Sequence, residues 1–300
     1  MIGRLLQHIL KLAGKITGRT FLYYKPNNHN KLGATAVKAE AGFWYAGNVY
    51  DINDIAYGIA QNGLVEKQET QLVDRILTVL AQSKRLMVYD IGANTGYYSI
   101  FSAFKHNAYV AAFEPVPAHV ACLQESREMN RLEEHIQIFT CGLGDYAEEK
   151  VLYLGGSGSS FNSQFLGKPD AESTRVSVEK LDALATREEL VYPDFVKIDV
   201  EGFEYNVLRG AQTVLQHSKP VLFIEISSSL RSIGRAFQND KYTETFSLLS
   251  TMGYLPYKLV DSVLQQHDTN APQGEGIHMY LFLHPEVHTN LAATIGISLS

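Results

Sequence analysis

Short apolar runs alternate with amphipathic segments along most of this chain. The apolar runs lie at 86–91, 109–113, 136–140, 195–200 and 221–226. Segments whose apolar residues recur at helical spacing follow most of them, at 97–104, 117–130, 204–216 and 241–252. Strand–helix alternation of this kind is typical of a parallel sheet covered by helices on both faces. The pattern therefore predicts an α/β fold built on a doubly wound, mostly parallel sheet.

The alternation breaks at two places. Apolar runs at 254–259 and 279–284 have no helix between them, which predicts an antiparallel strand at the C-terminal edge of the sheet. Between the third and fourth core strands, shorter apolar stretches at 151–154 and 174–178 are joined by a loop rich in Gly and Ser. They predict a β-hairpin insertion at about 142–180 that hangs over one edge of the sheet.

The first part of the chain follows a different pattern. Over 1–20, apolar residues recur at helical spacing between Arg and Lys residues, which predicts a basic amphipathic helix. Residues 21–48 hold many aromatic residues with Gly, Asn and Pro and predict irregular or short β structure, whereas 50–82 are predicted to be helical. We therefore divide the chain into an N-terminal, mainly helical extension at 1–85 and an α/β domain at 86–300.

The basic helix at 1–20 has several interpretations. It lacks the pure apolar run and the small-residue cleavage site of a signal peptide. No stretch of about 18 uninterrupted apolar residues predicts a membrane span. A helix of this kind packs on its own domain, contacts a second subunit in a homodimer, or makes a peripheral contact with a membrane surface. The sequence leaves these alternatives open.

Composition narrows the classes of function. The 300 residues carry a formal net charge of −6. This balance argues against nucleic acid as a partner, because proteins that bind its phosphate backbone concentrate Lys and Arg. The two cysteines, Cys122 and Cys141, match no metal or redox spacing and indicate reduced, mostly buried thiols. With no sign of an oxidising compartment, we expect a cytoplasmic protein.

The strongest local signal is the stretch VYDIGANTGYYSI at 88–100. An apolar strand leads into a turn with Gly92 and Gly96, where glycine permits a tight turn and a close approach of the backbone to a ligand. The spacing differs from the GxGxxG of dinucleotide sites. Asp90, at the end of the strand, would repel a diphosphate, but it suits the positively charged amino or sulfonium group of S-adenosyl-L-methionine.

The following strand ends in Glu114, whose carboxylate can accept hydrogen bonds from both hydroxyls of a ribose. We expect Pro115 and Val116 to shape the adenosine pocket. Asp145, after the third strand, either reaches the adenine amino group or is a simple turn residue. The residues predicted to bind S-adenosyl-L-methionine are Asp90, Gly92, Ala93, Asn94, Thr95, Gly96, Tyr97, Glu114, Pro115, Val116 and Asp145.

A second signal, FVKIDVEGFEYNVLRGA at 195–211, contains an apolar strand that ends in acidic residues. Asp199 closes this strand, Glu201 follows, and Glu225 lies near the end of the next strand. Neighbouring parallel strands would bring Asp199 and Glu225 to the same edge as the glycine turn. Carboxylates so close together need compensation by Lys197, by a bound cation or by the charge of the cofactor. Alternatively, these acids form ion pairs that serve the structure alone.

Methyl transfer to a hydroxyl needs alignment of the acceptor oxygen and removal of its proton. The candidates for catalytic roles are the acids Asp199, Glu201 and Glu225, together with His278, which comes just before the last predicted strand. Oxygen atoms of Asp199 and Glu225 would also suit a divalent metal such as Mg²⁺. Since the chain lacks a tight cluster of His and Asp ligands, the sequence assigns no metal.

At these residues the chain resembles the FkbM family of methyltransferases. The resemblance rests on VYDIGANTGYYS, on FEPVP, and above all on the VKIDVEGFEYNVLRGA run followed by FIEI, and it covers about residues 50–284. It implies a class I methyltransferase (Rossmann-like) fold and O-methylation of a hydroxyl on a sugar, glycan or other secondary metabolite. By position, it implies that Asp199 and Glu201 line the reaction centre and that Ser159 and Ser160 lie toward the acceptor substrate.

Two other functions share part of this pattern. An NAD(P)-dependent oxidoreductase would have the same early strand, glycine turn and acidic residue, but Asp90 and Asn94 disfavour its diphosphate. A non-catalytic module that binds an adenosyl ligand would keep the fold without turnover. For the preferred function, the expected partner is a small-molecule or carbohydrate acceptor.

Overall fold

The computed structural model describes residues 21–23, 35–49, 52, 54–156, 158–168, 170–230, 237–269, 274–297 and 299. The helix predicted at 1–20, with its proposed membrane or subunit contact, lies outside these residues. Within them, no helix combines the length and the apolar character needed to cross a lipid bilayer.

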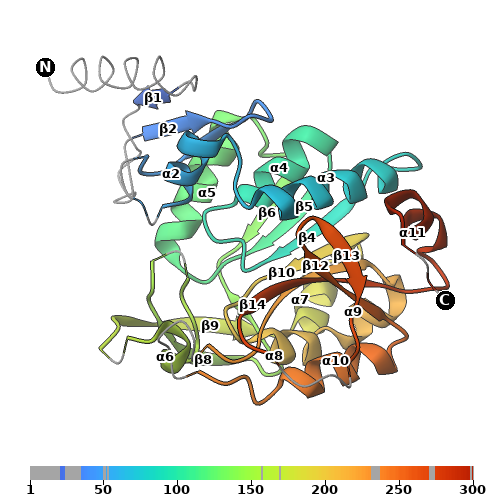
Figure 1. Cartoon of the computed structure of the whole chain (residues 1–300). Coiled ribbons are helices and arrows are strands. Elements are labelled where there is room, and N and C mark those ends of the chain that lie inside the picture. Colours follow the sequence, from blue (N-terminus) through green and yellow to red (C-terminus); the bar gives the residue numbers. More distant parts are fainter. Residues whose placement is uncertain are drawn as a thin grey trace, which may run out of the picture.

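An eight-stranded sheet forms the centre of the molecule, in the order β13-β12-β14-β11-β10-β4-β5-β6 (Figure 1). Its strands are β4 (Met87–Ile91), β5 (Tyr109–Phe113), β6 (Ile136–Phe139), β10 (Phe195–Ile198), β11 (Val221–Ser227), β12 (Leu255–Val260), β13 (Val263–Gln266) and β14 (Ile277–Leu283). From β11 to β6 all neighbours run parallel. This arrangement confirms the predicted doubly wound, mostly parallel fold of the Rossmann-like type.

The two strands with no helix between them, β12 and β14, pair antiparallel as expected, but the strand at the C-terminal edge of the sheet is a different one. β14 is antiparallel to β11, but it lies between β11 and β12 rather than at the edge. The edge strand is β13, which the sequence pattern missed because its residues are half polar. β12 and β13 are joined by Asp261 and Ser262, both with positive φ, in a two-residue hairpin turn.

Helices cover both faces of this sheet (Figure 1). One face packs against α2 (Ile55–Asn62), α3 (Lys67–Leu80), α4 (Tyr97–His106), α5 (Pro117–Met129) and α11 (Thr289–Ile295). The other packs against α7 (Leu181–Arg187), α8 (Glu204–Arg209), α9 (Gln212–Ser218) and α10 (Tyr242–Thr251). Successive side chains of a strand point to opposite faces, so Val88 of β4 joins the first core and Tyr89 the second.

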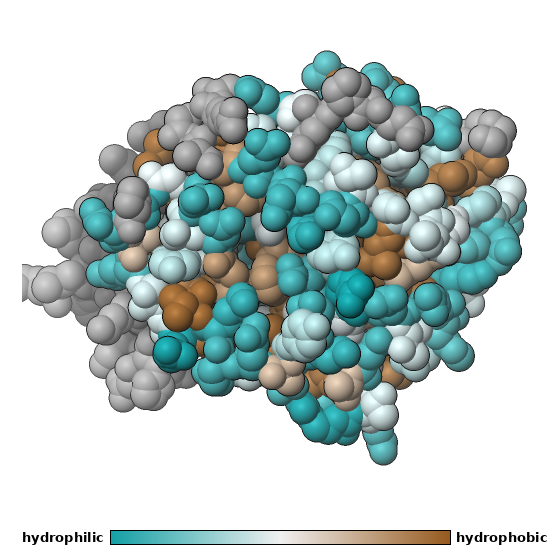
Figure 2. Space-filling view, turned by 90° about the horizontal axis from the view of Figure 1, so that it is seen from below, coloured by the Kyte–Doolittle hydropathy of each residue, from teal (hydrophilic) through white to brown (hydrophobic). Residues whose placement is uncertain are grey.

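A second, small sheet follows β6, in the order β7-β9-β8. Its parts are β7 (Gly142–Leu143), β8 (Glu148–Tyr153), α6 (Ser163–Leu166) and β9 (Ser173–Glu179). β8 and β9 pair antiparallel, as the apolar stretches at 151–154 and 174–178 predicted. On the face that includes this region (Figure 2), hydrophobic residues form separate patches between hydrophilic ones, as is usual for a water-exposed surface.

The described residues of the N-terminal extension at 1–85, called the N-terminal segment below, pack into the core of the α/β domain. Its strands β1 (Phe21–Tyr23), β2 (Thr35–Lys38) and β3 (Trp44–Ala46) form the predicted short β structure. β3 is fixed to α5, because the Trp44 N–H donates to Asn130 Oδ1 (2.8 Å) and the Ala46 N–H donates to Ser126 Oγ (3.0 Å). Apolar residues of 36–80 belong to the same buried cluster as those of β4 and β5.

Candidate active site

The glycine turn lies at the carboxyl end of β4. Gly92 has a φ of 77°, and a Cβ atom there would stand 1.9 Å from the backbone oxygen of Asp199. Gly96 has a φ of 91°, and a Cβ there would stand 2.1 Å from Leu123 Cδ1. Glycine is therefore required at both positions, because the turn packs tightly against β10 and α5.

Asp90 is almost completely buried at the end of β4, with 2% of its surface exposed. The Ser99 hydroxyl on α4 donates a hydrogen bond to Asp90 Oδ2 (2.5 Å). Burial raises the pKa of Asp90, whereas the nearby ammonium group of Lys197 lowers it. A second positive charge close to this carboxyl would favour its ionised form further.

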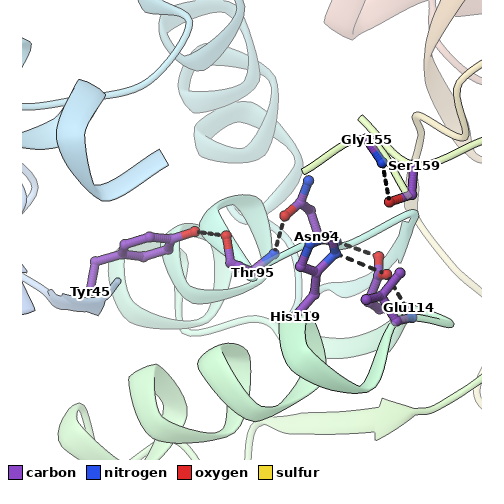
Figure 3. Close-up of polar contacts among 8 residues, drawn as sticks. Tyr45, Asn94, Thr95, Glu114, His119, Gly155 and Ser159 are labelled. Atoms are coloured by element: carbon purple, nitrogen blue, oxygen red, sulfur yellow. Dashed lines mark hydrogen bonds and ion pairs between the residues drawn. The ribbon is translucent and has the colours of Figure 1, made fainter. Parts of the chain in front are cut away.

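Glu114 ties the end of β5 to the glycine turn (Figure 3). The Asn94 N–H donates to Glu114 Oε2 (2.8 Å), and the Val116 N–H donates to Oε1 (2.9 Å). His119 Nδ1 lies 3.3 Å from the same Oε1. On the other side of the turn, the Tyr45 hydroxyl from β3 contacts Thr95 Oγ1. The turn is thus held from both sides, and the carboxylate retains acceptor capacity for a ligand.

A first cavity of about 620 Å³, including its open mouth, lies beside Glu114. The predicted residues in its lining are Gly92, Asn94, Glu114, Pro115, Val116, Ser159, Asp199 and Glu201. Apolar side chains, Phe113, Leu143, Leu152 and Phe161 among them, form much of the remaining wall. The buried carboxylate of Glu114 next to these apolar side chains is suited to a nucleoside, which has both ribose hydroxyls and an apolar ring face.

A second cavity, of about 660 Å³ including its mouth, adjoins the first. The two share Gly92, Asn94, Asp199 and Glu201 in their linings, so they form one crevice at the carboxyl ends of the strands. The second cavity adds Ile55, Val65, Glu66, Asp90, Ala93, Tyr97, Tyr98, Lys197 and Glu225. Its wall carries five carboxyl groups and the ammonium group of Lys197, whereas the wall of the first carries three carboxyl groups.

Three of the predicted acids come together at the crevice. Oxygen atoms of Asp199, Glu201 and Glu225 all lie within 4.8 Å of one another. Lys197 is 3% exposed and donates to Asp199 Oδ2 (2.7 Å). Burial lowers the pKa of Lys197, but the carboxylates of Asp199, Asp90 and Glu66 outweigh it and raise the pKa. Lys197 is thus the predicted compensating charge of the cluster.

Glu225 faces this cluster from β11. Its pKa is raised well above the ordinary value, first by burial and then by the negative charges of Asp199 and Glu201. Carboxylate oxygens at this spacing are ligands of the kind that Mg²⁺ takes. Lys197, however, already forms an ion pair with Asp199, so the negative charge of the cluster is partly neutralised without a metal.

His278 is not brought to the site. In the pairing of β11 with β14, His278 stands opposite Ile226, whereas Glu225 stands opposite Met279. Neighbouring residues of a strand point to opposite faces, so His278 lies on the other face of the sheet from Glu225. Its Nε2 lies 3.3 Å from the Glu275 backbone oxygen. The prediction that His278 faces the site is therefore wrong, and with it the expected catalytic role of this residue.

Besides His278, the predicted residues that line neither cavity are Thr95, Gly96, Asp145 and Ser160. Asp145 accepts a hydrogen bond from Asn206 Nδ2 (3.0 Å), and the nearby Gly142 and Leu143 line the first cavity instead. The Ser160 hydroxyl donates to the backbone oxygen of Glu201 (2.6 Å). Thr95 contacts Tyr45. The carboxylate of Asp145 thus binds α8, and its expected contact with the adenine amino group stays a prediction.

Sequence reasoning missed several residues that line the crevice. Glu66 and Tyr98 face the second cavity, and His119 and Phe161 face the first. His119 had a detectable signal, because it lies in the first turn of the helix that follows Glu114. Glu66 had none, since it lies far from every motif in the chain.

A family match and a curated relative both point to methyltransferases. The family described as Methyltransferase FkbM domain matches residues 90–256. Methyltransferase 1 of Beauveria bassiana (strain ARSEF 2860) is 26% identical over 159 residues, a match that covers 46% of this chain and 63% of that protein. This chain therefore spans less than two thirds of the fungal protein's length.

Solved structures give similar matches. Methyltransferase FkbM from Methylobacillus flagellatus KT is 19% identical with a TM-score of 0.42, over 66% of this chain and 43% of that chain. A TehB-like SAM-dependent methyltransferase from Corynebacterium glutamicum ATCC 13032 is 10% identical with a TM-score of 0.41. That match covers 76% of this chain and 93% of the Corynebacterium chain.

Proposed function

Because this chain belongs to the family of the methyltransferase FkbM domain, we propose that it transfers a methyl group from S-adenosyl-L-methionine to a hydroxyl oxygen of a sugar, glycan or other small metabolite. One observation carries the proposal: a cavity lined by Glu114 and several apolar side chains opens into an acidic cavity that contains Lys197 and Glu225. Cofactor and acceptor would meet where the two cavities join, at Gly92 and Asp199.

The residues of the first cavity fit the cofactor. Glu114 would accept hydrogen bonds from the ribose hydroxyls, and Phe113, Val116 and Leu143 would contact the adenine. Gly92 lines both cavities and has no side chain, so that its backbone would border the ligand. S-adenosyl-L-methionine, when bound, supplies an electrophilic methyl group on a positively charged sulfur.

Apart from Asp90, which we expect to face the positively charged end of the cofactor, the acids of the second cavity would handle the acceptor. Asp199 lines both cavities, and Lys197 fixes the orientation of its carboxylate through the 2.7 Å hydrogen bond. We assign to Asp199 the role of taking the hydroxyl proton as the oxygen is methylated. Glu201 and Glu225 would orient the acceptor by accepting hydrogen bonds from it. In the net change, one O–CH₃ bond would replace the S–CH₃ bond of the cofactor, S-adenosylhomocysteine would leave as a neutral thioether, and the hydroxyl proton would pass to the carboxylate of Asp199.

Cofactor binding separates this function from an oxidoreductase. Isothermal titration calorimetry is expected to detect binding of S-adenosylhomocysteine and none of NAD⁺ by the purified chain. The opposite pattern would favour the oxidoreductase. Binding of S-adenosylhomocysteine without turnover of any acceptor in a panel of sugars, glycans and lipids would favour a non-catalytic adenosyl-binding module.

The proposed role of Asp199 predicts a separation of turnover from cofactor binding. Asp199→Asn is expected to lower kcat by about 100-fold or more, because general-base catalysis contributes roughly 10²–10⁴-fold. Affinity for S-adenosylhomocysteine should stay within about tenfold, since Glu114 and the turn are intact. Formation of S-adenosylhomocysteine and calorimetry measure the two quantities. Asp170→Asn, at an exposed position outside both cavities, is the control. Full activity of Asp199→Asn removes this residue from the mechanism.

A further inference from the structure

Part of the wall of the second cavity comes from outside the segment that matches the family. Ile55, Val65 and Glu66 precede residue 90, where the family match begins, yet they line the cavity together with Asp199 and Glu225. Glu66 immediately precedes α3 and has a φ of 43°, a backbone conformation that is unusual for a residue other than glycine. The N-terminal segment thus contributes directly to the acceptor side of the crevice.

The carboxylate of Glu66 is held at the cavity by α4. The Tyr98 hydroxyl donates a hydrogen bond to Glu66 Oε2 (2.8 Å). Tyr98 is 8% exposed, and Lys197 Nζ lies 4.9 Å from the centre of its ring. These contacts place Glu66 beside the Lys197–Asp199 pair although the residue itself stands at the exposed rim. The carboxylate is therefore oriented before any ligand arrives.

Two carboxylates at this cavity have acceptor capacity to spare. Within the described part of the chain, Glu66 Oε1 and both oxygens of Glu225 receive no hydrogen bond from protein groups. A carboxyl group accepts hydrogen bonds when it is ionised and can also donate one when it is protonated, and burial raises the pKa of both Glu66 and Glu225. Hydroxyl groups of a ligand satisfy a carboxyl group in either state, because a hydroxyl both donates and accepts hydrogen bonds. A ligand with phosphate or carboxylate groups would meet only like charges, apart from the already paired Lys197.

Resting on the proposed function, we propose that Glu66 binds the acceptor and selects an uncharged polyhydroxyl unit, such as a sugar ring without phosphate. Glu66 Oε1 accepts a hydrogen bond from one hydroxyl of this unit while another hydroxyl lies at Asp199. Specificity arises from attraction of donors by Glu66 and Glu225 and from repulsion of anionic acceptors. The N-terminal segment, rather than the matched segment alone, then determines which acceptor enters.

The test uses the full chain with S-adenosyl-L-methionine and a panel of methyl hexosides and the matching hexose phosphates. Formation of S-adenosylhomocysteine is expected with at least one neutral hexoside and with none of the phosphates. For that hexoside, Glu66→Ala is expected to raise KM by about tenfold or more, because hydrogen bonds to charged groups contribute roughly 1.5–3 kcal/mol. kcat should change less than about threefold, since Glu66 does not take the proton.

Matched variants exclude a merely structural effect. Glu69→Ala changes an acid of the same helix end that lines neither cavity, and it should leave KM unchanged. Glu66→Gln keeps the size of the side chain and an acceptor oxygen for Tyr98, so it should fold as the parent does. It should raise KM for the hexoside less than Glu66→Ala, and it should relax the exclusion of hexose phosphates.

Several outcomes would overturn the assignment of Glu66. These are turnover of phosphates in preference to neutral hexosides, no turnover of any hexoside, or the same KM in Glu66→Ala and Glu69→Ala. A loss of S-adenosylhomocysteine affinity in Glu66→Ala of tenfold or more would make Glu66 a cofactor residue instead. Failure of the unaltered chain to bind S-adenosylhomocysteine is a separate result, which would overturn the proposed function itself.

Discussion

Gly92 determines how closely the glycine turn approaches β10. Its φ of 77° and the 1.9 Å distance from a built Cβ to the Asp199 oxygen are two separate obstacles to a side chain. Gly92→Ala is expected to lower the free energy of unfolding by about 3 kcal/mol, since overpacking and left-handed backbone each destabilise by roughly 1–3 kcal/mol. It should also weaken binding of S-adenosylhomocysteine, because the turn must move.

Gly156 is the matched control for this substitution. It has nearly the same φ, 75°, but a Cβ there would meet no atom within 4 Å. Gly156→Ala should therefore destabilise by the conformational part alone, about 1 kcal/mol. Urea denaturation and calorimetry measure both variants. Equal losses of stability in the two variants would show that the close contact of Gly92 with the backbone oxygen of Asp199 does not contribute to the destabilisation.

Glu204 adds a pH dependence to the stability of the site. It begins α8, is 2% exposed, and accepts a hydrogen bond from the Gly202 N–H (2.9 Å). Burial raises the pKa of Glu204 from 4.5 to about 7. Since the folded state binds this proton more tightly than the unfolded state, the contribution to stability is complete below pH 4.5. It is lost as the pH rises to about 7.

Glu204→Gln is expected to remove this dependence, because glutamine keeps an acceptor for Gly202 without a charge. The stability of the variant relative to the parent should increase by about 3 kcal/mol between pH 4.5 and pH 8. Urea denaturation at a series of pH values measures the difference. Exposed Glu172→Gln should show a constant difference over the same range. A constant difference for Glu204→Gln as well would contradict the raised pKa.

Among whole elements, the strands of the parallel sheet were the most predictable from sequence. Helices cover both of their faces, so each strand is a nearly continuous apolar run, as in Tyr109–Phe113 of β5. The sequence pattern did not predict β13, because an edge strand need not be apolar and the half-polar stretch VLQQ is also typical of a loop. The strand that lies at the exposed edge is determined by the order of the strands in the sheet. The sequence of β13 alone does not contain this information.

Helix boundaries depended on contacts between distant segments. The pattern at 204–216 predicts one helix, but the structure has α8 and α9 with a break after Arg209. A Cβ at Gly210 would stand 1.9 Å from the backbone oxygen of Gly144, so the break coincides with a close contact to the segment after β7. The helical periodicity of residues 204–216 cannot predict this contact, because the contact involves a residue outside that segment.

The direction of each side chain was the hardest feature of the site to predict. The motifs placed Asp90, Glu114, Asp199 and Glu225 at the correct edge of the sheet. His278 failed because a shift of one residue along a strand turns a side chain to the other face. Glu66 was missed because its place depends on how α3 packs on α4, which no local pattern records.

In the whole molecule, one hydrophobic core joins the N-terminal segment to the matched family segment. Val37, Tyr45 and Ile76 belong to the same buried cluster as Val88 and Val110 of the central sheet. Hydrogen bonds from β3 to α5 and the contact of Tyr45 with Thr95 extend this connection to the glycine turn. A core shared in this way makes the stability of the turn depend on the N-terminal segment.

The single tryptophan of the chain tests this dependence. Trp44 lies in β3, and its backbone oxygen accepts a hydrogen bond from Asn130 Nδ2 (2.6 Å), so its fluorescence reports on the N-terminal segment. Circular dichroism at 222 nm reports on all helices together. We expect the two signals to change in one coincident urea transition, because segments with a common core unfold together.

Ligand binding makes the same test sharper. S-adenosylhomocysteine at about 100 times its Kd should shift both signals by the same amount, about 2.7 kcal/mol of added stability. The shift of the Trp44 signal is the decisive part, since this residue lines neither cavity. If the Trp44 transition precedes that of the helices and does not respond to the ligand, the N-terminal segment is a separate unit. Glu66, which belongs to it, would then be too weakly anchored to select an acceptor.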